Sequence, residues 1–238
     1  MHLKTVTIIL FFALFSCQLP AQTIIHGKND IWLFNLLNHK INDKWSLGNE
    51  LHFRMDDYFK DRQQILIRPF ANYHLSDKVI LTSGYSFILT SPYGDFPLAT
   101  NKAEHNLWTQ ALLKNQIGKW NLAHRYRLEN RWQGNIVELN ETYEVNDFGF
   151  SNRFRYRFDL RRDIKGNLFL HLFDELWVKE TNTFQQINYD RNWLYAGLGW
   201  KMNKRLTIEV AYLHQYVRNN DSRFENHHTL QISTILNF

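Results

Sequence analysis

The sequence predicts an all-β protein folded as a single antiparallel transmembrane β-barrel of 10 to 12 strands. The first observation is that apolar and polar residues alternate with a period of two along most of the chain, as in strands with two different faces. The second is that the alternating runs span about 11 to 15 residues, whereas strands of soluble domains favour about 5 or 6. Tilted strands that cross a bilayer need about 9 to 11 residues, so strand length favours a membrane barrel. The third is the aromatic last residue, Phe238.

The composition excludes a bundle of membrane helices and a nucleic-acid-binding protein. The mean hydropathy of −0.45 is too polar for several apolar runs of about 20 residues each. Lys and Arg total 28, and Asp and Glu total 23. Removal of an N-terminal leader that contains only Lys4 leaves 27 − 23 = +4, spread along the chain and not clustered on the basic face that nucleic acids require.

Residues 1–21 have the layout of a secretory signal peptide, and residues 22–238 form the expected barrel. Lys4 supplies the positive end, an apolar run extends from Val6 to Phe15, and a short polar exit ends at Ala21. The only cysteine, Cys17, lies in this segment; acylation of Cys17, as in a lipoprotein, is the alternative. If Cys17 is removed with the signal peptide, the mature chain has no cysteine, which excludes disulfides and thiolate chemistry.

Eleven alternating segments follow one another along the chain. They lie near residues 31–39, 43–54, 63–75, 78–89, 103–115, 118–132, 147–160, 166–178, 188–202, 204–217 and 226–238. Tight connections such as "NDK", "LSD" and "IGK" alternate with longer polar ones at 55–62, 90–102, 133–146, 179–187 and 218–225, as in outer-membrane barrels. Because bacterial single-chain barrels have even strand numbers, we expect a twelfth strand within "TIIHGKND", in preference to ten strands.

Each segment has one apolar and one polar face, and we expect the polar face to point into the lumen. In "DFGFSNRFRYRFDLR" aromatic residues alternate with arginines. Buried charges must pair or stay hydrated, since an unpaired one is costly. The predicted inward charge network comprises Glu50, Arg54, Arg68, Glu104, Arg125, Arg127, Glu129, Arg131, Arg153, Arg155, Arg157, Glu175, Arg191 and Glu209. Two interpretations remain open: a structural salt-bridge network, or a lumen that attracts anions because arginines outnumber acids.

Aromatic residues near the strand ends are expected to form the girdles of a membrane barrel, with an aromatic-rich soluble core as the alternative. They are Trp32, Trp45, Tyr73, Trp108, Trp120, Trp132, Trp177, Trp193, Trp200 and Tyr212. The last strand has Leu230, Ile232, Thr234 and Leu236 on the face of Phe238. An ending of this kind is typical of the signal that the outer-membrane barrel assembly machinery reads.

Several consecutive stretches resemble one family. They are "RQQILIRPFANY", "EHNLWTQ", "HRYRLENRW", "RFRYRF", "FDELW" and "YDRNWLYAGLGW". They resemble the Gram-negative outer-membrane barrel family catalogued as domain of unknown function 2490, over about residues 30 to 238. The resemblance implies location and fold but no activity. In "YDRNWLYAG" an arginine usually follows the asparagine in that family; here Arg191 precedes Asn192, and Trp193 takes the usual place of the arginine.

Residues for enzyme chemistry are present but in no diagnostic spacing. A hydrolase would need a nucleophile within reach of a base. The candidates are His105, His124, His171, His214, His227, His228, Ser83, Ser86, Ser151 and Ser233. Adjacent residues of a strand point apart, so Asp174 and Glu175 cannot act as a pair, nor can His227 and His228 share a metal. We expect no metal and no cofactor.

The sequence therefore predicts a monomeric, non-enzymatic protein of the Gram-negative outer membrane, either structural or a narrow anion-preferring pore. The second candidate is a lipid-active outer-membrane enzyme, for acyl transfer or hydrolysis. A soluble periplasmic β-sandwich is the third, which the long strands and Phe238 argue against. The expected partners are membrane lipid, lipopolysaccharide and the barrel assembly machinery.

Overall fold

The computed structural model describes residues 24–94, 97–181, 186–218 and 223–238. The predicted signal peptide and Cys17 lie outside these ranges. The strands are β1 (Ile24–Lys40), β2 (Trp45–Asp56), β3 (Asp61–Ser76), β4 (Val79–Thr90), β5 (Lys102–Ile117), β6 (Trp120–Leu139), β7 (Thr142–Lys165), β8 (Leu168–Thr181), β9 (Gln186–Lys201), β10 (Leu206–Arg218) and β11 (Arg223–Asn237). Within the described residues no helix is long and apolar enough to cross a membrane.

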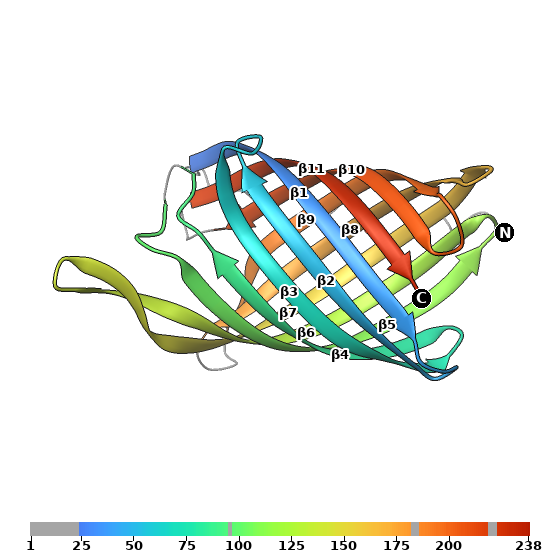
Figure 1. Ribbon diagram of the computed structural model, residues 1–238, viewed down its shortest axis with the longest axis horizontal. Helices are drawn as coiled ribbons and strands as arrows, with labels where there is room; N and C mark the ends of the chain where they lie inside the picture. The colour runs from blue at the N-terminus through green and yellow to red at the C-terminus, as the bar shows by residue number, and fades with distance from the viewer. Residues whose placement is uncertain (1–23, 95–96, 182–185, 219–222) are drawn as a thin grey trace.

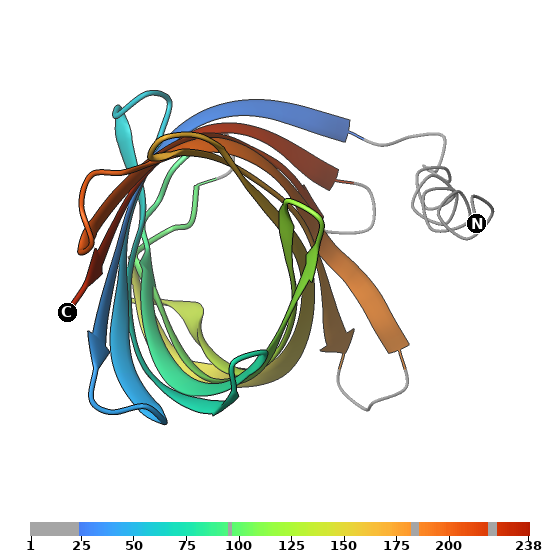
Figure 2. The same ribbon diagram turned by 90° about the vertical axis from the view of Figure 1, so that its right-hand side faces the viewer.

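The strands close into one barrel, which Figure 2 shows nearly end-on. Consecutive strands pair antiparallel, and β1 pairs with β11 in parallel, from Ile24 opposite Arg223 to Asn38 opposite Asn237. An odd ring requires one parallel pair, because directions that alternate cannot close on themselves after eleven strands. The all-β barrel of 10 to 12 strands is confirmed, but the preference for twelve is wrong: the residues of "TIIHGKND" from Ile24 on extend β1 and form no separate strand.

The connections define two ends of the barrel. We call the end with residues 41–44, 77–78, 118–119, 166–167 and 202–205 the turn end, and the opposite end the loop end. Most predicted strand positions hold within a few residues. The predicted long loop 133–146 is an exception, since β6 and β7 continue through it as a hairpin that projects beyond the barrel (Figure 1). The structure therefore has fewer long loops than the sequence pattern predicts.

The outward face is rich in exposed apolar side chains. Along β2 Leu47 and Phe53 point outward, while the adjacent residues Ser46, His52 and Arg54 are buried. The same alternation places Leu128 outside the barrel and Arg127 and Glu129 inside. Each strand therefore separates an apolar exterior from a polar interior, as the sequence predicts.

The predicted aromatic girdles are only partly outward. Trp45 and Trp200 are 47% and 57% exposed, and Tyr212 also lies outside. Trp32, Trp108, Trp177 and Trp193 are buried instead, and they point into the barrel. The face that a side chain takes is decided by its place in the alternation along the strand, which we call parity, and not by its distance from the strand end. The Trp108 ring, for example, fills the space beside Gly84 on β4, where an added Cβ would lie 2.4 Å from it.

The C-terminal residue is hydrogen-bonded to the last residues of β1 at the turn end. The Phe238 amide donates to the Asn38 carbonyl (2.9 Å), and the Lys40 amide donates to the Phe238 carbonyl (2.9 Å). The Phe238 side chain is 59% exposed. Its role as an assembly signal stays a prediction.

Candidate functional site: the charged interior of the barrel

The centre of the interior is an ion-pair network built on two fully buried carboxylates, Glu129 of β6 and Glu175 of β8. Arg155 of β7 bridges them: Nη1 lies 2.7 Å from Glu129 Oε1, and Nε lies 2.7 Å from Glu175 Oε1. Arg153 donates from Nε to Glu129 Oε2 at 2.6 Å, and Arg125 donates to Glu175 at 2.5 Å. Strand alternation brings these side chains together because β6, β7 and β8 are neighbours. The network stabilises three adjacent strands from the inside.

Smaller ion pairs surround this centre. Arg131 forms a bidentate ion pair with Glu104, in which Nε lies 2.7 Å from Oε1 and Nη2 lies 2.7 Å from Oε2. Arg68 contacts Glu50 at 3.0 Å. The other pairs are Arg157 with Asp159 (2.9 Å), and Arg153 (3.4 Å) and Arg191 (3.2 Å) with Asp190. Glu209 accepts hydrogen bonds from His171 and Tyr195. The structure thus joins most of the residues that the sequence places inside, and adds Asp190.

An aromatic cluster lies beside these charges. It consists of Trp32, Phe173, Trp177, Trp193, Tyr195, Ala211 and Leu213, from β1, β8, β9 and β10. Trp193 is central, with ring centroids 5.5 Å from Trp32 and 4.5 Å from Trp177. The interior therefore has a wall rich in arginines and a wall of aromatic rings.

Arginines and tryptophans meet where the two walls join. The Arg155 guanidinium carbon lies 3.4 Å from the Trp177 ring centroid, and that of Arg127 lies 4.0 Å from Trp108. Arg54 lies 3.8 Å from Trp32 and 5.8 Å from Trp193. Such cation–π contacts are worth about 2 kcal/mol when they are shielded from water. They explain why tryptophans occupy the inward positions of this barrel.

A chamber of about 180 Å³ remains between the walls. Its wall includes six arginines and three glutamates: Arg54, Arg68, Arg125, Arg155, Arg157, Arg161, Glu50, Glu175 and Glu209. Each of the three glutamates already has a partner. Leu36 and Ile235, near the ends of β1 and β11, also line the chamber, so it extends toward the turn end.

The loop end of the interior is covered differently. Residues 91–94 of the β4–β5 connection lie over it: the Ser91 amide bonds to the Gln63 carbonyl, and an added Cβ at Gly94 would lie 3.2 Å from Lys28 Nζ. Burial, with Glu225 and Asp30 nearby, raises the pKa of the Tyr93 hydroxyl to about 12. Asp30 and Asp56 are also buried at this end. This rim is acidic, whereas the chamber is lined mainly by arginines.

The histidines of the sequence-based candidates form no catalytic triad in the described residues. His105, His124 and His228 lie on the outward face, where each bonds to a tyrosine hydroxyl. The ring of His214 lies 5.5 Å from that of His228. The remaining two are held by carboxylates: His171 by Asp159 and Glu209, and His227 by Asp30 and Glu225.

The candidate serines pair elsewhere. Ser86 bonds to Arg68 and Trp108, Ser151 to Gln133, and Ser233 to Gln231. Glu175 is inside the barrel, whereas Asp174 bonds to Asn192 on the outward face. No group of three or more potential ligands in the described ranges is arranged to hold a metal.

Some interior residues escaped the sequence analysis. Asp30 and Asp56 are buried at the loop end, and parity with Trp32 and Arg54 was the available signal. Asp190 is inside because the register shifts between Trp177 and Val178, which no alternation pattern reveals. A hydroxyl–imidazole pair, Ser46 Oγ with His74 Nε2 at 3.1 Å, also lies inside.

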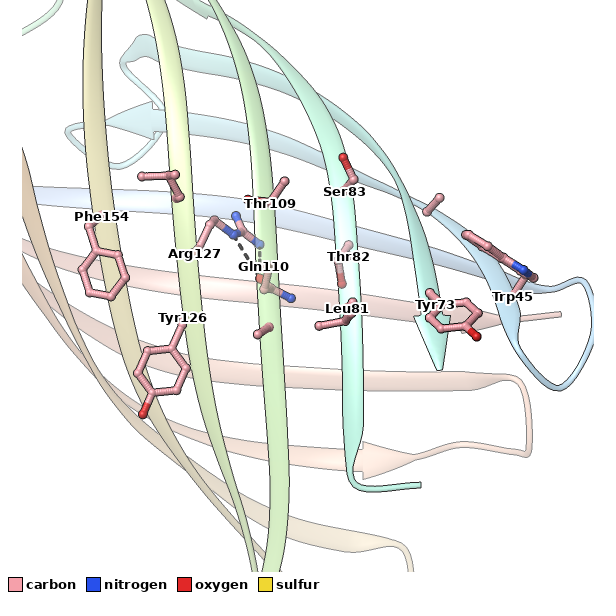
Figure 3. A pocket seen from close by; sticks show the side chains of 13 residues that line it. Trp45, Tyr73, Leu81, Thr82, Ser83, Thr109, Gln110, Tyr126, Arg127 and Phe154 are labelled. Atoms are coloured by element: carbon pink, nitrogen blue, oxygen red, sulfur yellow. Dashed lines mark hydrogen bonds between the residues drawn. The ribbon is translucent and has the colours of Figure 1, made fainter. Parts of the chain in front are cut away.

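The outward face carries one groove of about 550 Å³ over β2 to β7. Figure 3 shows it from close by: Trp45 and Tyr73 lie at one side, and Tyr126 and Phe154 at the other. Small residues form its floor, among them Ala71, Ser83, Thr109 and Ala111. The lining is almost entirely apolar, and no histidine is part of it.

The fold and its interior define the class of protein: a closed β-barrel with a charged and aromatic interior. Residues 29–226 match the family described as "Protein of unknown function (DUF2490)", and the chain belongs to this family. The chain is 24% identical over 226 residues to an uncharacterized protein of Methylorubrum extorquens, which covers 92% of this chain and 90% of that protein. No solved structure matches this chain.

Proposed function

We propose that the protein is a non-enzymatic barrel of the Gram-negative outer membrane whose narrow interior admits small anions in preference to cations. The observation that supports the proposal is the contrast between the two faces of the barrel wall. Apolar side chains cover the outside, and around the chamber inside arginines outnumber carboxylates. An apolar exterior on a closed barrel is what a bilayer requires, because no strand edge is left unpaired. The turn end would face the periplasm, as short turns do in such barrels.

The anion preference follows from which charges are compensated. Glu50, Glu175 and Glu209 all have donors, so they neutralise part of the arginine wall. Arg54 bonds through Nη1 to the neutral Gln64 oxygen at 2.7 Å, and within the described residues its Nε has no hydrogen-bond partner. A buried positive charge of this kind attracts anions and repels cations within a narrow, low-dielectric passage.

The test is single-channel conductance of the refolded mature chain in a planar bilayer, with reversal potentials measured in a salt gradient. We expect small current steps carried mainly by anions. Arg54→Glu should reduce or reverse the preference, whereas Arg162→Glu, a matched change at an exposed position of the turn end, should not. A folded barrel that passes no current would reject the passage, and cation preference in the unmodified chain would reject the charge argument.

A lipid-directed activity is the second candidate, favoured by the outward groove. The acyl chain of a membrane lipid would cover its apolar lining and small-residue floor. The Ser83 and Thr109 hydroxyls in the groove have no imidazole beside them within its lining, which favours binding of lipid over its cleavage. Lipid A and phospholipid profiles of cells with and without the protein test this candidate. Unchanged profiles would exclude an enzyme.

A further inference from the structure

We propose that the chamber is a binding site for a small aromatic carboxylate, which enters from the turn end. The inference rests on the anion preference proposed above and specifies the ligand. Three features support it: the Arg54 guanidinium on β2, aromatic rings near it, and a volume that matches one ring with a carboxylate.

The donor is Arg54, an inward residue of β2 that is 7% exposed and lines the chamber. Its Nη1 donates to the neutral Gln64 oxygen, and within the described residues its Nε is buried without a hydrogen-bond partner. Leaving a buried donor unsatisfied costs about 1–3 kcal/mol, and more when the group is charged. A carboxylate in the chamber that accepts from the Arg54 guanidinium would neutralise its charge.

The neighbouring strand holds Arg54 and the adjacent inward residue His52 in place. Trp32 is opposite Arg54 in the β1–β2 register, and Phe34 is opposite His52. The Phe34 and His52 ring centroids are 4.6 Å apart, and Arg54 stacks on Trp32 at 3.8 Å. Rotamers fixed in this way reduce the entropy that binding would otherwise cost.

The aromatic wall suits an aromatic ring. Trp177, Trp193 and Tyr195 all line the chamber, and Arg54 and Arg155 both lie 5.8 Å from the Trp193 ring centroid. A ligand whose carboxylate reaches Arg54 therefore has its other end among these rings. An inorganic anion would neutralise Arg54 but leave the aromatic wall without a contact.

The volume selects for size. A cavity of about 150 Å³ is known to accept a benzene ring. At about 180 Å³, the chamber holds one ring and a carboxylate but not a fused or extended ligand. Access from the turn end agrees with the positions of Leu36 and Ile235 in the wall and with the cover of residues 91–94 at the loop end.

The experiment uses the refolded mature chain in detergent micelles. Benzoate is titrated by calorimetry and by tryptophan fluorescence, beside acetate, which lacks the ring, benzyl alcohol, which lacks the charge, and inorganic phosphate. We expect benzoate to bind at least tenfold more tightly than the other three and to change tryptophan emission. Arg54→Gln should weaken benzoate at least tenfold, and the exposed control Arg162→Gln should leave it unchanged.

Folding of each variant is checked by heat-modifiable gel mobility. Arg54→Lys provides a second variant, which keeps the charge and loses the planar donor, and should bind benzoate more weakly than the unmodified chain. Equal affinities for benzoate and acetate, tighter binding of phosphate, or unchanged benzoate binding by both Arg54 variants would overturn the proposal. Conductance on the same preparation separates the two ideas: anion current without benzoate binding rejects only the ligand, whereas cation preference rejects the proposed function.

Discussion

Arg155 Nη1 lies 2.7 Å from Glu129 Oε1 in the centre of the barrel, and Arg153 bonds to the other oxygen of the same carboxylate. Glu129 is fully buried, and with Glu175 and Asp190 it compensates the charges of these two buried guanidinium groups. Removal of one partner from a buried ion pair is costly because the remaining charge stays out of water.

Glu129→Gln should therefore lower the free energy of unfolding by about 3–5 kcal/mol. The measurement is urea unfolding of the refolded barrel in lipid vesicles, followed by tryptophan fluorescence. Glu138→Gln changes the same chemical group in the projecting β6–β7 hairpin, where it is exposed, and should alter stability by less than about 0.5 kcal/mol. Similar values for the two variants would show that the interior charges are hydrated and energetically unimportant.

The pairing of the parallel strands β1 and β11, which we call the seam, is stabilised by Asp30. Its Oδ2 accepts from His227 Nδ1 at 2.8 Å and from Thr229 Oγ1 at 3.3 Å, both across the seam. Asp30→Ala leaves buried polar groups of β11 without this acceptor, at a cost of about 1–3 kcal/mol.

We expect faster hydrogen–deuterium exchange along β1 and β11 in this variant, with β4 to β7 unaffected. Asp43→Ala, at a position exposed on a turn, serves as the control. Exchange that increases evenly around the barrel would mean that Asp30 stabilises the whole fold and not the seam in particular.

Parity along the strands was sufficient to predict the inward charges, because a strand can change face only through a bulge. It was also sufficient to place Glu175 inside and Asp174 outside, a prediction that the structure confirms. The same rule, applied to Trp177 and Trp193, would have placed both inside, but proximity to strand ends favoured a girdle. The chemical preference of tryptophan for an interface and its stacking on arginine are both favourable, so residue type alone cannot decide between them.

The number of strands and the contacts across the barrel were harder to predict from the sequence. The alternation in "TIIHGKND" continues that of β1, but an even-number rule drawn from other barrels suggested a separate strand. Contacts such as Arg54 with Trp193 join β2 to β9, and no local pattern indicates them. The chamber arises from closure of the ring, so its residues become a site only in three dimensions.

The tip of the projecting hairpin holds a strained residue. Asn140 and Glu141 both have positive φ, 49° and 65°, in the two-residue turn between β6 and β7. Such a turn favours Asn followed by Gly, and a left-handed conformation costs other residues about 1 kcal/mol. Glu141→Gly should therefore slow amide exchange in Val137 to Tyr143, whereas Glu141→Val, with a branched Cβ, should accelerate it. Because the hairpin extends beyond the barrel, neither variant should change urea unfolding of the remaining strands; a shared shift would mean that hairpin and barrel unfold as one unit.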